Sequence, residues 1–136
     1  MLAKTDSPGL RVYAAWLPIL KADTEEEAAD SAGDLADPRV LHFWNPDMSL
    51  AAEASRALRI TAQLEQAWDV FLVYGPDATW EGEHLPAPTA WMHHLSQKDP
   101  RWMTPDRLLK VVQALLPEPA TSKKATPAAT APARRQ

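Results

Sequence analysis

The strongest run of β-branched and aromatic residues in the chain covers residues 70–74, and glycine, proline and aspartate at 75–77 follow it. Side chains of this kind favour strands, and the three residues that follow favour a turn. Because the run is apolar at consecutive positions, we expect a strand with both faces covered, as in the centre of an α/β layer. The rest of the chain should supply the covering elements.

Two shorter apolar runs precede this strand. Residues 11–17 predict a buried strand that ends at Pro18, whose missing N–H would interrupt a ladder. Asp23 or Thr24 can cap a helix that follows, and Thr24 with a glutamate three positions later is typical of a capping box. Residues 39–44 then predict a second strand, which Asn-Pro-Asp turn chemistry ends. The first half of the domain is therefore expected to be a strand-helix-strand unit.

A second helix is predicted after residue 47. Apolar residues recur at helical spacing from residue 50, and Asp47 or Ser49 can cap the first turn. The pattern predicts a helix that ends near Ile60 or continues to Glu65. This helix leads to the strand at 70–74.

The last third of the domain predicts a hairpin and a terminal helix. Residues 79–81 are expected to begin the return strand, and residues 90–95 are expected to be an edge strand or a helical turn. Thr104 as N-cap and Pro105 at the first helical position predict the terminal helix. The predicted fold class is α/β, with the chain order β-α-β-α-β-β-α.

Composition narrows the possible chemistry. The chain has 136 residues, 46% of them apolar, which suits one domain with a real core. It contains no cysteine, which excludes a disulfide framework, a Cys-ligated metal site and a thiol nucleophile within this chain. We see no signal-peptide pattern and no apolar run long enough to cross a membrane, and we expect a cytoplasmic protein.

Charge is distributed unevenly. Residues 117–136 hold four basic side chains and one acidic one, a charge of +3, so the total of −4 leaves −7 for residues 1–116. An acidic body disfavours nucleic acid and anionic membrane as partners, because phosphate groups need clustered Lys and Arg. The Pro/Ala/Thr-rich composition of 117–136 predicts a disordered tail after a domain at 1–116.

Three stretches resemble bacterial thioredoxin-like proteins of little-characterised function. They are residues 12–16, residues 37–44 and residues 67–76, and the resemblance covers roughly residues 10–116. It implies a three-layer α/β/α sandwich with a central mixed sheet. The chain differs from redox-active members in having no Cys-X-X-Cys motif and, on this alignment of elements, no first strand-helix unit. Trp68 and Asp69 stand where that family places a cis-proline.

Six tryptophans provide the candidate binding residues. Trp16 and Trp44 are at the ends of predicted strands, and the strand ends of open α/β sheets surround functional edges. Trp68 and Asp69 lie near the same edge by analogy with the thioredoxin-like layout. We predict that these four residues form an aromatic surface that binds a protein or peptide, while core packing remains the alternative for each tryptophan.

Four histidines are the only candidate metal ligands beside carboxylates. His42 with His93 or His94 could form a site, but adjacent residues on a strand point to opposite sides, so only one of the pair could join His42. We predict no metal, no other cofactor and no complete catalytic constellation.

Three functional hypotheses follow. The first is a non-catalytic thioredoxin-like domain that binds a protein or peptide. The second is a truncated or decayed thiol-disulfide oxidoreductase, and the third is a histidine-based metal-binding protein. The absent first strand would leave an unpaired sheet edge, which predicts a homodimer.

Overall fold

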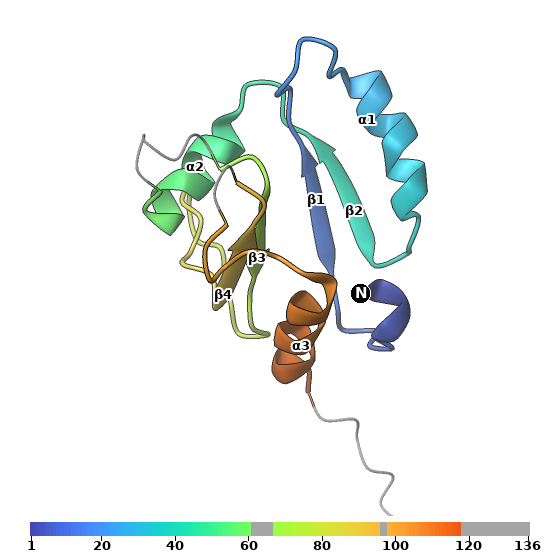
Figure 1. Ribbon diagram of the computed structural model, residues 1–136, viewed down its shortest axis with the longest axis vertical. Coiled ribbons are helices and arrows are strands. Elements are labelled where there is room, and N and C mark those ends of the chain that lie inside the picture. Colours follow the sequence, from blue (N-terminus) through green and yellow to red (C-terminus); the bar gives the residue numbers. More distant parts are fainter. Residues whose placement is uncertain (61–66, 96–97, 118–136) are drawn as a thin grey trace, which may run out of the picture.

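The computed structural model describes residues 1–60, 67–95 and 98–117 (Figure 1). The predicted tail at 118–136 lies outside the described residues. The described part is a mixed α/β domain, which confirms the predicted fold class. Its elements in chain order are a 3₁₀ turn at Leu2–Lys4, β1 at Val12–Trp16, α1 at Glu25–Ala32, a 3₁₀ turn at Gly33–Leu35, β2 at Val40–Trp44, α2 at Ser49–Leu58, β3 at Val70–Val73, β4 at Ala90–His93 and α3 at Pro105–Leu115.

The first half is a parallel strand-helix-strand unit. β1 pairs with β2 in a register that sets Val12 opposite Val40 and Trp16 opposite Trp44. The hydroxyl of Thr24 accepts the N–H of Glu27 at 3.2 Å, so Thr24 is the N-cap of α1 as predicted. In Figure 1, α1 runs beside β2 on the side away from β1.

The second half is an antiparallel pair followed by a helix. β3 pairs with β4, with Val70 opposite His93 and Val73 opposite Ala90. The prediction that residues 79–81 begin the return strand was wrong, because they lie in the connection and the strand forms only at residues 90–93. The proline at either side of Ala87 explains the delay, since proline cannot donate to a ladder.

The strands form two separate two-stranded sheets within the described residues, where one central mixed sheet was expected. All four residues of β3 are half-buried, so the expected full cover on both faces is also absent. In the view of Figure 1, β1 lies between β2 and the β3–β4 pair.

A small core joins α2 to the β3–β4 half. Ala54 on α2 is buried with Ala67 and Leu85, and partly buried apolar residues of α2 and β3 pack around them. The helix starts after Met48, which has a left-handed backbone (φ 60°) and provides no side-chain cap. The predicted caps were wrong, although the Asp47 carboxylate accepts the N–H of Ser49 at 3.0 Å.

The end of α2 and the start of α3 follow from local chemistry. α2 ends at Leu58, where Arg59 adopts a left-handed conformation (φ 55°), and a continuation toward Glu65 falls on residues outside the described part. Thr104 caps α3 by accepting the N–H of Arg107 at 3.3 Å, and Pro105 occupies the first helical position, as predicted. None of the described helices has both the length and the apolar content needed to cross a membrane.

Candidate functional site

One face of the β1–β2 pair is apolar and exposed. The residues of this outer face are Tyr13, Ala15, Leu41 and Phe43. The exposed fractions are 66% for Tyr13, 48% for Leu41 and 51% for Phe43. Tyr13 stands opposite Leu41 and Ala15 opposite Phe43, and the Tyr13 and Phe43 rings stack with their centroids 6.2 Å apart. Contiguous exposed apolar residues of this kind mark surfaces that contact other molecules.

The sequence pattern did not reveal this face. It predicted a buried strand at residues 11–17, and the structure contradicts that prediction for Tyr13 and Ala15. Because every residue from 12 to 17 is apolar or aromatic, the pattern contains no polar positions that would identify an outward side. Only the pairing of β1 with β2 shows which side chains point outward.

The opposite, inner face of the same pair holds two of the predicted binding residues. Trp16 and Trp44 are half-buried and opposite each other in the register. The indole N–H of Trp16 donates to Nδ1 of His42 at 3.2 Å, and the two rings stack with centroids 6.1 Å apart. This bond uses the acceptor nitrogen of a neutral His42 ring and assigns the ring proton to Nε2.

A hydrogen-bonded loop follows Trp44. The side-chain amide of Asn45 donates to Asp47 at 2.7 Å and to Ser49 at 3.0 Å, and its oxygen accepts the N–H of Leu50 at 2.9 Å. Hydrogen bonds from Ser49 lower the pKa of the Asp47 carboxyl. These bonds hold Met48 in its left-handed conformation, which a side chain with a Cβ adopts only at a cost. The loop therefore supports the start of α2.

Asp69 lies beside His94, the residue that follows β4. Trp68 is 40% exposed. The backbone carbonyl of Asp69 accepts the N–H of His94 at 2.9 Å, and its carboxylate lies 3.8 Å from Nδ1 of His94. Nε2 of His94 is 3.0 Å from the carbonyl of Met103, so this nitrogen is the donor. The His94 ring also lies 4.9 Å from the Trp102 ring.

His93 is a buried structural residue. Its exposed fraction is 4%, its Nδ1 accepts the N–H of Leu95 at 3.1 Å and its Nε2 lies 2.9 Å from the Asp99 carboxylate. Arg101 contributes most to holding the pKa of Asp99 well below its usual range, and the His93 hydrogen bond adds to the effect. Because both ring nitrogens are in use, His93 has no lone pair available for a metal or a substrate.

The predicted metal candidates do not converge. His42 contacts Trp16 on β1, whereas His93 and His94 contact groups around β4 and Trp102. The described ranges contain no group of three or more histidine, aspartate or glutamate side chains that could hold a metal ion. In the same ranges, no hydroxyl side chain is hydrogen-bonded to a histidine, so no nucleophile–base pair is formed there.

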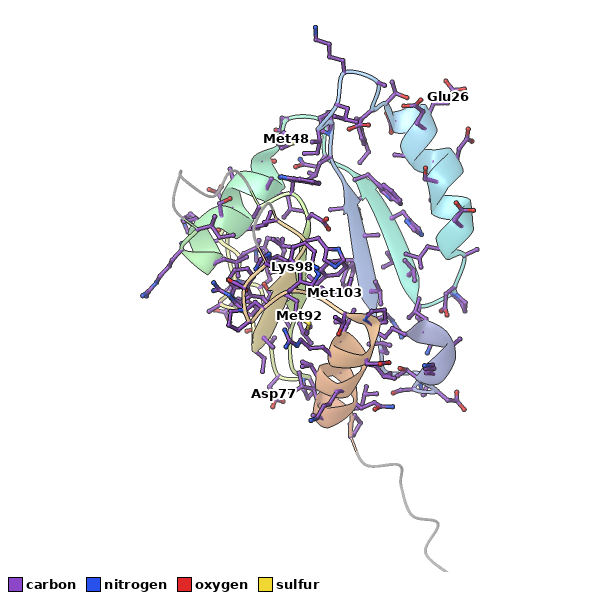
Figure 2. The ribbon with its side chains drawn as sticks, viewed as in Figure 1. Glu26, Met48, Asp77, Met92, Lys98 and Met103 are labelled. Atoms are coloured by element: carbon purple, nitrogen blue, oxygen red, sulfur yellow. The ribbon has the colours of Figure 1, made fainter. Side chains whose placement is uncertain are left out.

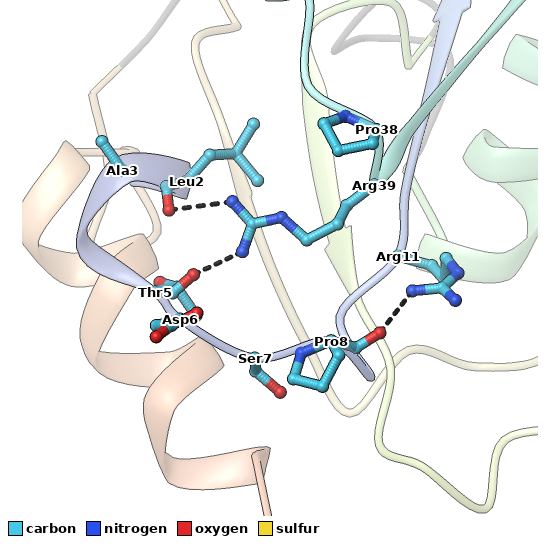
Figure 3. Close-up of a pocket in the computed structure, with 9 residues that line it drawn as sticks. All are labelled: Leu2, Ala3, Thr5, Asp6, Ser7, Pro8, Arg11, Pro38 and Arg39. Atoms are coloured by element: carbon cyan, nitrogen blue, oxygen red, sulfur yellow. Dashed lines mark hydrogen bonds between the residues drawn. The ribbon is translucent and has the colours of Figure 1, made fainter.

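A groove of about 880 Å³ near the N-terminus was also not predicted (Figure 3). Arg39 crosses it, donating to the carbonyls of Leu2 and Thr5 while its ion pair with Asp37 closes at 2.7 Å. Arg11 donates to the carbonyl of Pro8 at 2.6 Å. Both guanidinium groups are therefore bonded to the protein, and Arg39 ties the N-terminal turn to the start of β2.

The predicted aromatic edge is divided in the structure. Trp16 and Trp44 share the inner face of β1–β2, and Trp68 with Asp69 lies at the start of β3. Among residues 1–60, 67–95 and 98–117, no hydrogen bond, ion pair or ring contact joins the two groups. The outer face of β1–β2 is the larger exposed apolar surface.

Comparison of the sequence with protein families, with curated proteins and with solved structures finds no match. The functional assignment therefore depends on the geometry of the chain itself.

Proposed function

We propose that this chain is a non-catalytic domain that binds a protein or peptide through the outer face of β1–β2. One observation carries the proposal. Tyr13, Ala15, Leu41 and Phe43 are contiguous, apolar and exposed on two paired strands. The stacked pair of Tyr13 and Phe43 offers a broad ring surface, and rings of this kind contribute strongly to interfaces.

The exposed area of the Tyr13 and Phe43 rings supports binding of modest strength. An aromatic side chain buries roughly 150–250 Å² in full, so the exposed parts of Tyr13 and Phe43 together amount to roughly 200 Å². At about 25 cal/mol per Å², covering them contributes about 5 kcal/mol. Association costs at least about 4 kcal/mol in lost freedom, so these two rings alone give weak binding. A partner that binds tightly must also contact neighbouring surfaces.

The predicted binding residues Trp16, Trp44, Trp68 and Asp69 lie outside this face, because Trp16 and Trp44 are on the inner face of β1–β2 and Trp68 and Asp69 precede β3. Trp68 is the most accessible of the three tryptophans at 40% exposure, and Trp16 and Trp44 are half-buried. We retain a thioredoxin-like arrangement as the proposed finer fold. Its supports are the parallel β1–α1–β2 unit, the antiparallel β3–β4 pair and the terminal α3.

The test begins with peptides selected on the full-length chain from a random displayed library. Their affinities are then measured for the native chain, for a Tyr13→Ser/Phe43→Ser variant and for a Trp80→Ser control. Trp80 is 55% exposed in the connection between β3 and β4, which makes it a matched exposed aromatic residue outside the outer face. We expect the double variant to lose at least about tenfold in affinity, equivalent to about 1.4 kcal/mol, and the control to stay within about twofold. Peptides that bind the native chain and the double variant equally would refute the proposed surface.

A further inference from the structure

The outer face of β1–β2 has an acidic neighbour. α1 contacts β2 and runs beside it, and α1 with the adjoining turn carries five exposed acidic residues (Figure 2, where Glu26 is labelled). These residues are Glu25, Glu26, Glu27, Asp30 and Asp34. In the part of the chain that the structure describes, none of them takes part in an ion pair. An occupant of this region should therefore combine a rigid apolar backbone with positive charge.

The chain itself contains a segment with that chemistry. Residues 118–136 hold three prolines and four basic residues, and Glu118 is their one acidic residue. Proline-rich segments bind aromatic surfaces at low entropic cost, because their extended conformation is already preferred. Arginine and lysine in the same segment can pair with carboxylates that flank the aromatic surface. The positive segment and the negative body are thus complementary within one molecule.

We propose that residues 118–136 bind in cis to the outer face of β1–β2, with their prolines on Tyr13 and Phe43 and their basic residues on the carboxylates of α1. This inference rests on the proposed function, because it concerns the same face and makes the segment a competitor of the external partner. The partner class follows from it: an external ligand would be another proline-rich, basic segment.

Chain length permits the contact. α3 ends at Leu115, and Arg134 lies 17 positions after Pro117. An extended chain spans at most about 3.5 Å per residue, which gives a reach of roughly 60 Å from Pro117, whereas a domain of this size has a radius of gyration of roughly 13 Å. A tethered segment also experiences an effective concentration on the order of millimolar, so weak docking would be populated.

The absence of cysteine provides a direct test on the full-length chain. Ala129→Cys introduces a single thiol between the two basic pairs, and a nitroxide label there broadens amide signals of nearby residues. We expect the amide signals of Tyr13, Leu41, Phe43 and α1 to lose at least half of their intensity, and those of Asp77 and its neighbours in the β3–β4 connection to keep theirs. Salt at 1 M should restore the lost intensity, because it shortens the screening length to about 3 Å.

Two matched variants of the labelled chain complete the experiment. Replacing Lys123, Lys124, Arg134 and Arg135 with serine should abolish the broadening, and so should Tyr13→Ser/Phe43→Ser. Uniform or absent broadening in the native sequence would overturn the proposal. Broadening seen only when a spin-labelled chain is mixed with an isotope-labelled one would also overturn it, because the segment would then bind another copy. Neither result affects the peptide-selection test, so failure of this inference is distinguishable from failure of the proposed function.

Discussion

Replacement of His93 tests the assignment of this residue as a buried connector instead of a ligand. Its ring joins the backbone after β4, through Leu95, to the Asp99 carboxylate, and Trp91 and Trp102 lie against it with ring centroids 5.6 and 6.0 Å away. His93→Ala removes both hydrogen bonds and leaves a cavity. We expect a large decrease in the free energy of unfolding.

The size of the expected decrease follows from the two hydrogen bonds of the His93 ring. A hydrogen bond to a charged group contributes about 1.5–3 kcal/mol, and a buried donor left without a partner costs about 1–3 kcal/mol. The N–H of Leu95 is in that position, because Leu95 is 4% exposed. We expect His93→Ala to cost about 3–5 kcal/mol, a large part of the roughly 5–15 kcal/mol by which domains are stable.

Two further variants separate the bonds. The side-chain oxygen of Asn can replace Nδ1 as acceptor from Leu95, and the side-chain nitrogen of Gln can replace Nε2 as donor to Asp99. His93→Asn and His93→Gln should each recover about half of the loss. The measurement is urea unfolding followed by tryptophan fluorescence. A cost below about 1 kcal/mol for His93→Ala, or equal costs for all three variants, would refute the connector role.

Four other outcomes are expected. The hydrogen bond from Arg56 contributes most to lowering the pKa of Glu53 from 4.5 to about 2. The ionised Glu53 carboxylate therefore stabilises the fold fully above about pH 4.5, and this stabilisation is lost as the pH falls toward 2. Glu53→Gln should make the acid unfolding curve flatter in that pH window. Arg59→Gly should raise the free energy of unfolding by about 0.5–1 kcal/mol, because glycine adopts φ 55° without strain, whereas Arg59→Ala should bring no such gain. Thr104→Ala should lower it by about 0.5–2 kcal/mol through loss of the α3 cap, measured by urea unfolding. Light scattering at high concentration should give a dimer mass if an edge of β1 or β3 pairs with another chain, and a monomer mass would count against that pairing.

Local chemistry explains the parts of the fold that the sequence could predict. The apolar run at residues 70–74 and the capping residues Thr24 and Thr104 act within a few positions, and each appears in the structure where expected. Such features depend on backbone propensity and nearby hydrogen bonds, which are readable along the chain. The α/β class follows from their order.

The remaining parts depend on contacts that are distant in sequence. The Asn45 side chain bonds the first turn of α2 together with Asp47, because the loop brings Asn45 and Leu50 together. The ring of His93 contacts Asp99 and that of His94 contacts Met103, and both partners come from beyond β4. Hydrophobic pattern also gave no basis for placing β1–β2 and β3–β4 in separate sheets.

The failed prediction for β1 is the most informative of these differences. A strand with apolar side chains on both sides is expected to have both sides covered, and the inner side, with Val12 and Trp16, is indeed partly buried. On the outer side, Tyr13 of β1 is 66% exposed, and Leu41 and Phe43 of β2 are exposed beside it. Exposed apolar side chains contribute little to the fold, because their burial is what stabilises it. Polar residues could therefore replace them at little structural cost. Their presence on paired strands of the same unit as α1, whose carboxylates form no ion pair in the described part, is the feature on which the proposed occupant depends.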